Sequence, residues 1–195
     1  MHISIEGLDG VGKTSLAKGI ARKLQVPFWE KPVHYLMGMD ESAYSAYRKM
    51  SERVNALPDS EKDIRAWFYG LGILYLRRVL GVESFITDRY LGSTYGWNGG
   101  PLSERVFDLM VDLAGKPELT ILVTCSAEER RNRMRKRNPQ DPDIIAEMND
   151  ADVNMKMEKF YRKHGFAYEV LDTTLKSQEE TFVAAMALLH DYKLV

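Results

Sequence analysis

Residues 5–15 read IEGLDGVGKTS, and this stretch decides the fold. It contains the pattern G-x(4)-G-K-[ST], the P-loop, whose backbone N–H groups cradle phosphate oxygens. The preceding residues 2–7, HISIEG, alternate as a short strand does, and residues 14–24 carry leucine and isoleucine at helical spacing. Because the pattern has the strand before it and the helix after it that a P-loop requires, we predict that the chain binds a nucleoside triphosphate.

The residue types in this loop suit phosphate chemistry. Gly10 and Gly12 let the backbone turn and approach phosphate oxygens with no Cβ in the way. The helix that begins near Lys13 directs its positive end at the same place, and the Lys13 ammonium adds a charge for the β- and γ-phosphates. The Thr14 hydroxyl is placed to ligate Mg²⁺. The expected ATP-binding residues are Gly7, Gly10, Val11, Gly12, Lys13, Thr14 and Ser15.

The composition excludes several classes of protein. The 195 residues carry a formal charge of −1, which gives no basic footprint for a nucleic-acid partner. A single cysteine, Cys125, excludes an internal disulfide and a multi-cysteine metal site. The opening MHISIEGLDG lacks the regions of a signal peptide, and no apolar run approaches the length of a membrane span. We therefore expect a cytoplasmic protein without a membrane partner.

Strands and helices are expected to alternate along the chain. Further strands are predicted at 26–30, 83–89, 118–125 and 166–172, and helices at 40–56, 63–80, 102–115, 130–137, 147–164 and after Ser177. Capping boxes are predicted at Ser126 and Ser177. The alternation predicts an α/β fold of the three-layer P-loop NTPase type, a doubly wound parallel sheet of about five strands that binds ligand at its carboxyl edge. We expect a single domain over residues 1–195.

P-loops occur in kinases, GTPase switches, motors and transport ATPases, and the sequence narrows this choice. A Ras-type GTPase would carry an Asn-Lys-x-Asp motif late in the chain, and no Asn-Lys pair occurs here. A motor or transporter would be longer and carry further modules. Small-molecule kinases are therefore favoured.

A second stretch, residues 87–100, reads TDRYLGSTYGWNGG. Together with the P-loop it resembles the thymidylate kinase family, whose members carry an acidic residue inside the P-loop, here Asp9, and an Asp-Arg-Tyr triplet, here beginning at Asp88. Trp97 and Asn98 stand where the family usually has Tyr and Gln. The family also has an arginine-rich lid after its fourth strand, which corresponds here to a lid segment at about 130–145. Arginines occupy positions 130, 131, 133, 135 and 137 of this chain.

The resemblance implies roles for these residues. Asp9 would accept a hydrogen bond from a sugar hydroxyl of the acceptor, and Asp88 would orient Mg²⁺ through water or contact that sugar. Arg89 would neutralise the phosphate in transit. Arg133 and Arg137 lie four residues apart, hence on one helix face, and we expect one or both to enter the site.

The acceptor side departs from the family pattern. Phe68, on an aromatic helix, is our first choice for stacking on the acceptor base, but Gly72 stands four residues later, where the family has an arginine. The family's Arg-Glu-Pro is replaced here by residues 29–32, Trp-Glu-Lys-Pro. This segment also resembles that of deoxynucleoside kinases. Trp97 and Asn98 complete the residues expected to bind the acceptor.

Two acceptors therefore stay open. A nucleoside hydroxyl needs a carboxylate base, for which Glu30 is placed, whereas a monophosphate needs cations, for which Lys31 and Arg89 serve. We favour the monophosphate, with dTMP as the first guess. A non-enzyme alternative is a nucleotide-binding switch or partner protein, although that needs no arginine lid. Related kinases are usually homodimers, and the apolar stripe of residues 102–115 fits either such an interface or the core.

Overall fold

The computed structural model describes residues 1–38, 40–79, 83–140, 144 and 150–195. Within these residues, five parallel strands form one sheet in the order β2-β3-β1-β4-β5. The strands are β1 (His2–Glu6), β2 (Phe28–Glu30), β3 (Phe85–Asp88), β4 (Leu119–Thr124) and β5 (Tyr168–Asp172). All of β1 is buried, as a central parallel strand covered on both faces should be.

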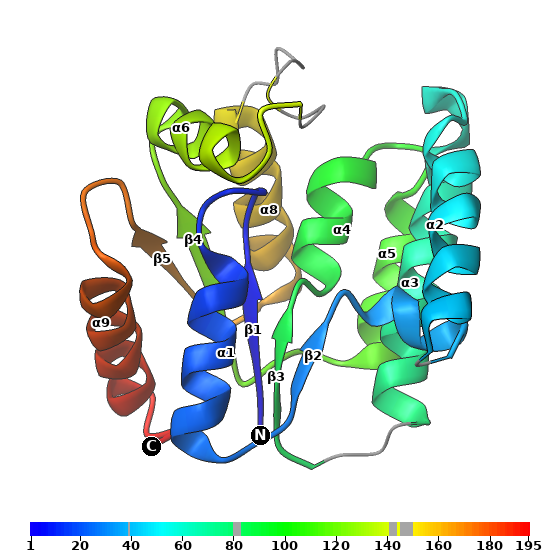
Figure 1. The fold of residues 1–195 in the computed structure, drawn as a ribbon. Helices are drawn as coiled ribbons and strands as arrows, with labels where there is room; N and C mark the ends of the chain where they lie inside the picture. Colours follow the sequence, from blue (N-terminus) through cyan, green and yellow to red (C-terminus); the bar gives the residue numbers. More distant parts are fainter. Residues whose placement is uncertain (39, 80–82, 141–143, 145–149) are drawn as a thin grey trace.

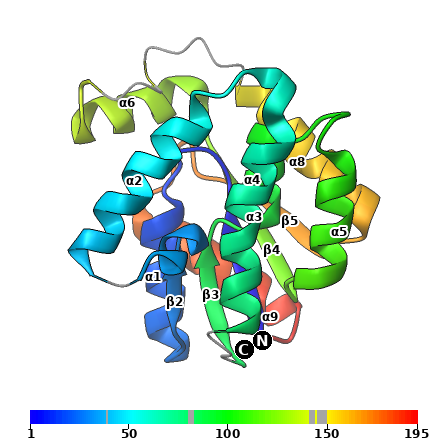
Figure 2. The same cartoon turned by 90° about the vertical axis from the view of Figure 1, so that its right-hand side faces the viewer.

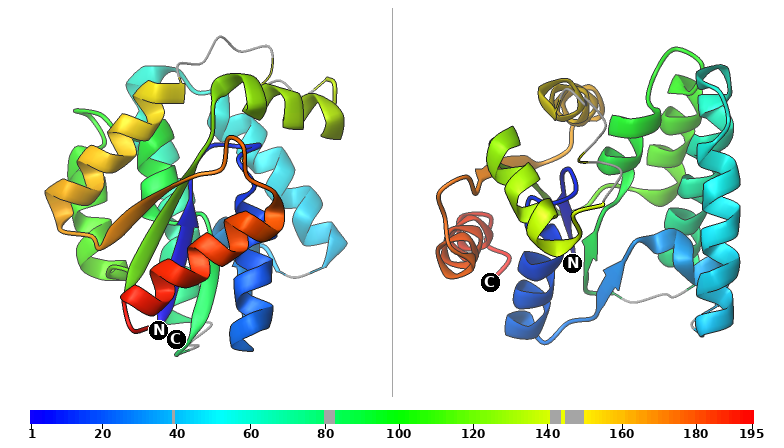
Figure 3. Two further views of the ribbon diagram at one scale, coloured as in Figure 1. Left: turned by 90° about the vertical axis from the view of Figure 1, so that its left-hand side faces the viewer. Right: turned by 45° about the horizontal axis from the view of Figure 1, so that its top comes forward.

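Helices cover both faces of the sheet. The α-helices are α1 (Lys13–Leu24), α2 (Glu41–Asn55), α3 (Lys62–Arg78), α4 (Leu91–Asn98), α5 (Glu104–Ala114), α6 (Ala127–Arg137), α8 (Asp150–His164) and α9 (Gln178–Asp191), and the short 3-10 helices are η1 (Pro32–Leu36) and η2 (Asp59–Glu61). Helices α1 and α9 pack together on one face (Figure 1). Helices α3, α4 and α5 stand in front of the other face (Figure 2). Helix α6 crosses above the carboxyl edge of the sheet (Figure 3).

Strand register brings three strand ends together below α6. In the paired strands, Asp88 at the end of β3 lies opposite Ile5 of β1 and opposite Glu30 of β2. The P-loop leaves β1 one residue after Glu6. The carboxyl ends of β1, β2 and β3 thus present the P-loop, Asp88 and Glu30 at one edge, which is where a parallel sheet of this type binds its ligand.

The predicted α/β fold with a parallel sheet is confirmed, with differences in detail. Helix α4 was not expected, since the glycines and polar residues of 91–98 carry no helical apolar pattern. The capping box at Ser177 is present. At Ser126 only half forms, because the hydroxyl caps the Glu129 N–H while the Glu129 carboxylate binds Arg133 instead.

The apolar stripe of α5 is divided between core and surface. Phe107, Met110 and Ala114 are buried, whereas Leu109 and Leu113 are 43% and 38% exposed. Part of two predicted segments lies outside the described residues. These parts are 141–143 and 145 of the expected lid segment, and 147–149 of the helix expected at 147–164. Among the helices that the structure describes, none has the length and hydrophobicity needed to cross a membrane.

Candidate active site

The P-loop packs tightly beneath α6. Gly10 and Gly12 have φ angles of 87° and 101°, in the left-handed region that favours glycine. A Cβ on Gly10 would lie 2.7 Å from Cγ of Met134 on α6, so only glycine fits there. Lys13, the first residue of α1, is buried, and its Nζ donates to the Leu8 carbonyl oxygen at 2.6 Å. Burial, followed by the charge of Arg89, lowers the Lys13 pKa to about 8.

Thr14 and Asp88 form a second polar pair beside the P-loop. The Thr14 hydroxyl donates to Oδ2 of Asp88, and Oδ1 of Asp88 is buried with no hydrogen-bond partner among the described residues. No set of three or more His, Cys, Asp or Glu side chains in the described part of the chain is arranged to hold a metal. Magnesium in kinase sites takes one or two protein ligands beside substrate phosphates, so a hydroxyl and an orphaned carboxylate oxygen fit it.

Asp9 lies among cations at the acceptor side of the P-loop. Its Oδ1 accepts a hydrogen bond from Nη2 of Arg89 and lies 3.6 Å from Nζ of Lys13. Burial alone would raise the Asp9 pKa, but the charges of Arg89 and Lys13 outweigh it and hold that pKa below its usual value. Arg89 has a φ of 78°, unusual for a residue with a side chain, and such strain is often found at functional sites.

Glu6 organises the Asp-Arg-Tyr segment, and the sequence reading missed it. Its buried carboxylate accepts the backbone N–H groups of Tyr90, Gly92 and Ser93, at 3.1, 3.0 and 2.8 Å, together with the Ser93 hydroxyl. These N–H groups belong to the start of α4, where a carboxylate is favoured by the helix dipole. An acid at the end of a short strand, directly before the P-loop, was the signal in the sequence.

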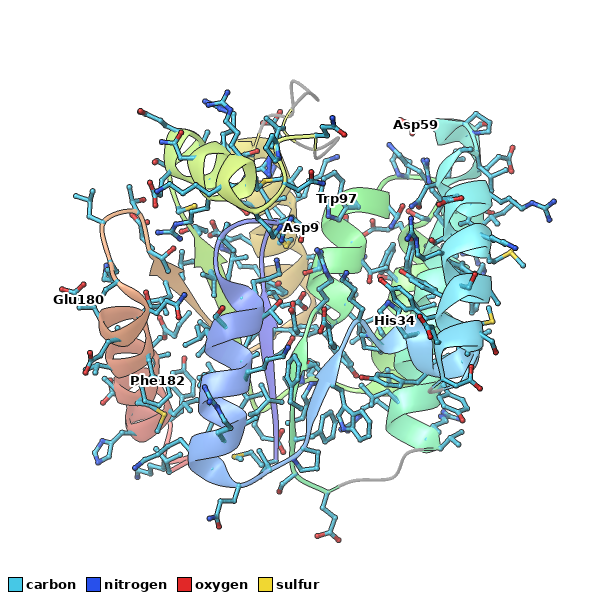
Figure 4. The ribbon with its side chains drawn as sticks, viewed as in Figure 1. Asp9, His34, Asp59, Trp97, Glu180 and Phe182 are labelled. Atoms are coloured by element: carbon cyan, nitrogen blue, oxygen red, sulfur yellow. The ribbon has the colours of Figure 1, made fainter. Side chains whose placement is uncertain are left out.

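A pocket of about 560 Å³ opens from Asp9 toward α2 and α3. Of the residues expected to bind the acceptor, five line it, namely Asp9, Lys31, Arg89, Trp97 and Asn98. Figure 4 shows Asp9 and Trp97 close together at the carboxyl edge, with Asp59 across the opening toward α2 and α3. The expected acceptor residues are therefore largely brought together, and we call this the acceptor pocket.

Glu30 and Phe68 are not among the residues that line the acceptor pocket. The backbone N–H of Glu30 donates to the Tyr35 hydroxyl, and Glu30 is the last residue of β2. The Phe68 ring lies parallel to that of Tyr47, with a centroid separation of 6.5 Å, and edge-on to Tyr69. Tyr47 and Tyr69 do line the pocket, so Phe68 packs behind the aromatic wall.

The sequence reading also missed residues that α3 and the preceding 3-10 helix η2 contribute. Lys62 and Arg65 line the acceptor pocket, and both form ion pairs with Asp59 at 2.8 Å. Arg65 stands four residues before Tyr69, so both lie on one face of α3. Their four-residue spacing was visible in the sequence, but which helix face borders a pocket depends on packing against η1 and α4.

A second pocket, of about 810 Å³, lies on the other side of the P-loop. Val11, Gly12 and Ser15 of the expected ATP-binding set line it, together with Arg133 and Thr173. Nη2 of Arg133 donates to the Thr173 carbonyl at 2.8 Å, and its Nη1 donates to Thr173 Oγ1 at 3.1 Å. We call this the donor pocket, because it continues from the phosphate-binding loop away from the acceptor pocket.

Arg133 and Arg137, the two arginines expected to enter the site, act on different sides of the P-loop. Arg133 is held at the donor pocket, while the charge of Arg137 contributes to the lowered pKa of Asp9 on the acceptor side. The P-loop therefore has arginine charge on both sides, next to a hydroxyl and a carboxylate that suit Mg²⁺. This arrangement suits the transfer of a phosphoryl group between two pockets.

Comparison with known proteins supports this geometry. No protein-family model matches the chain. A probable thymidylate kinase of Methanococcus maripaludis strain C7 is 27% identical over 188 residues, which cover 92% of this chain and 90% of that protein. Two further strains of this species have probable thymidylate kinases that match over the same length at 26% identity.

Solved structures share the fold. Thymidylate kinase from Ehrlichia chaffeensis matches with a TM-score of 0.65 at 17% identity, over 97% of this chain and 98% of that one. Deoxyadenosine kinase from M. mycoides with bound dCTP matches with a TM-score of 0.59 at 20% identity, over 98% of this chain and 100% of that one. The resemblance read from the sequence is thus confirmed, and this chain is a distant homologue of the thymidylate kinases with the fold of a P-loop kinase.

Proposed function

We propose that the chain transfers the γ-phosphoryl group of ATP to a nucleoside monophosphate, with dTMP as the first candidate. The observation that carries this proposal is the charge of the acceptor pocket. Four cations, Lys31, Lys62, Arg65 and Arg89, line it against two acids, Asp9 and Asp59. Glu30, the carboxylate that would serve a nucleoside hydroxyl as base, does not line it. An anionic acceptor needs cations rather than a base, because its attacking oxygen is already charged.

The residues of the site divide the work of this reaction. Lys13 and the N-terminus of α1 bind the donor phosphates, and Arg133 borders the donor nucleotide. Arg89 and Arg137 stabilise negative charge as the phosphoryl group moves, and Asp9 orients the acceptor. Thr14 and Asp88 would hold Mg²⁺, which neutralises the charge of the donor phosphates when bound. Trp97 and Asn98 close one wall of the acceptor pocket, and Tyr47 and Tyr69 offer faces for the base.

The cellular setting follows from the same kinase assignment. Because the substrates of a nucleotide kinase are free nucleotides, we propose that the chain acts in the cytoplasm. We further propose a homodimer, supported by the exposed apolar side chains of Trp67 and Leu71 on α3 and of Leu109 and Leu113 on α5, two helices that pack together. Sedimentation at several protein concentrations tests this, and a monomer at high concentration would reject it.

The test of the proposed function is ADP release with ATP and Mg²⁺ across a panel of acceptors. The panel contains dTMP, the other nucleoside monophosphates, thymidine and the other nucleosides. We expect turnover on a monophosphate and none on nucleosides. Turnover on a nucleoside alone would make the chain a nucleoside kinase, for which its similarity to deoxyadenosine kinase gives a precedent. ATP binding without turnover on any acceptor would favour a nucleotide-binding switch.

A further inference from the structure

Arg130 differs from Arg133 and Arg137, the two arginines of α6 that we expect at the site. It is 2% exposed and lines neither the donor nor the acceptor pocket. Its Nε and Nη2 donate to Oδ2 and Oδ1 of Asp150, at 2.7 and 2.9 Å, in a two-pronged pair that joins α6 to the first residue of α8. Moving this guanidinium onto a phosphate would leave Asp150 as an uncompensated, nearly buried charge, which is costly. Arg130 is therefore not placed to act on the phosphoryl group.

The third nitrogen of the same guanidinium reaches the P-loop. Nη1 of Arg130 donates to the main-chain carbonyl oxygen of Asp9 at 3.2 Å. The next residue, Gly10, lies so close that a Cβ there would be 3.2 Å from Cγ of Arg130. The tip of the P-loop therefore rests on the face of α6 that carries Arg130 and Met134.

Asp9 is thus held from two sides. Its main-chain oxygen is bound by Arg130, while its carboxylate pairs with Arg89 and lines the acceptor pocket. The glycine that follows Asp9 leaves the peptide free to rotate, so the carboxylate depends on these contacts for its direction. Asp150 in turn keeps Arg130 from rotating away, since it occupies the other two nitrogens.

We propose that Arg130 is a positioning residue for the acceptor. Clamped by Asp150, it fixes the main chain of Asp9 so that the carboxylate faces the acceptor pocket. This inference rests on the proposed function, in which Asp9 orients the acceptor. A displacement of about 1 Å at a substrate-orienting group can cost on the order of 100-fold in rate.

The test uses the double substitution Arg130→Met/Asp150→Leu. Replacing a buried ion pair by apolar side chains of similar volume is often neutral for stability, so the fold should survive while the contact to Asp9 is lost. We expect kcat/KM for the monophosphate to fall by roughly 10- to 100-fold. The Kd for ATP, measured without acceptor, should stay within about twofold of the wild type, because Arg130 does not line the donor pocket. A role confined to packing would not separate these two quantities.

Two further variants sharpen the result. Arg130→Lys keeps the charge but cannot span Asp150 and Asp9 at once, so it should show the same selective loss to a smaller degree. Lys136→Met removes an exposed cation of the same helix that lines neither pocket, and it serves as the matched control, with unchanged kinetics expected. If the double variant fails to fold, Arg130→Lys decides the question alone.

The outcomes separate the two proposals. A wild-type chain that phosphorylates a monophosphate, with an equally efficient Arg130→Met/Asp150→Leu variant, overturns the positioning role alone. Equal losses in ATP affinity and acceptor efficiency overturn it as well, since they indicate general loosening of the P-loop. A wild-type chain that neither binds nor phosphorylates any monophosphate rejects the proposed function, and the positioning role with it.

Discussion

Lys13 is the residue on which donor binding depends most directly. It is buried at the start of α1 and, in the structure, has only the Leu8 carbonyl and the more distant Asp9 carboxylate near its ammonium among the contacts described. We predict that Lys13→Ala abolishes turnover and leaves the thermal midpoint unchanged or higher, because it removes a buried charge whose pKa burial has already lowered. Steady-state rates and thermal unfolding measure both. Lys18→Ala, an exposed lysine on the same helix, is the control. Turnover like that of the wild type would reject the site.

Arg133 and Arg137 are expected to work as a pair from opposite sides of the P-loop. Arg133 borders the donor pocket, and the charge of Arg137 acts on Asp9. We predict that Arg133→Ala/Arg137→Ala lowers kcat by roughly 10³-fold, the scale on which arginines stabilise phosphoryl transfer. The two single variants should have different effects: Arg133→Ala should weaken ATP binding, and Arg137→Ala should lower kcat. An unchanged kcat in the double variant would mean that neither arginine takes part in catalysis.

At the scale of the element, the contact between α3 and η1 explains why the family's base-reading arginine is missing. Gly72 occupies that position, and a Cβ there would lie 2.2 Å from Cα and 2.5 Å from the backbone nitrogen of Val33. No side chain fits, because backbone cannot retreat as a flexible side chain can. The cations that α3 gives the acceptor pocket stand instead at Lys62 and Arg65, on an earlier part of the helix.

This contact gives a stability prediction. Gly72→Ala should destabilise the protein by about 1–3 kcal/mol, the usual cost of overpacking, despite the better helix propensity of alanine. Urea unfolding measures the free energy, with Gly100→Ala as control because nothing lies within 4 Å of its added Cβ. A stabilised Gly72→Ala variant would show that α3 and η1 are not packed in this way.

The packing of η1 against α2 gives a prediction of pH dependence. The His34 ring lies 5.1 and 4.3 Å from the rings of Tyr44 and Tyr47, and burial, followed by the charge of Lys31, lowers its pKa to about 4. The unfolded chain therefore binds a proton at His34 that the folded chain does not, and stability falls as the pH drops from about 6.5 toward 4.

Replacing His34 should remove this contribution. His34→Phe keeps an aromatic ring between the two tyrosines but cannot be protonated. We expect the free energy of unfolding of this variant to decline less between pH 7 and pH 5 than that of the wild type. Chemical denaturation at both pH values measures this free energy. Identical declines would mean that folding does not lower the pKa of His34.

For the whole molecule, the sequence predicted the architecture and the strand-loop-helix form of the P-loop well, because both rest on local patterns. The P-loop spacing, the apolar strands and the position of Asp88 at a strand end can be read within a few residues. Glu6 and Tyr47 were missed because their roles arise from partners far along the chain. Glu6 binds Ser93, and Tyr47 reaches the acceptor pocket only through the packing of α2 against η1 and α3. Phe68 was predicted from its residue type alone. The orientation of α3 places the next residue, Tyr69, at the acceptor pocket instead.

The central claim is that the γ-phosphoryl group of ATP passes to a nucleoside monophosphate. Incubation with ATP labelled at the γ-phosphate, Mg²⁺ and dTMP or another monophosphate, followed by chromatography, identifies the product that carries the label. The account predicts label in the β-phosphate of the nucleoside diphosphate, in the wild type and not in Lys13→Ala. Label that appears only in inorganic phosphate would contradict it, as would label that enters no diphosphate but enters a monophosphate when a nucleoside replaces the acceptor.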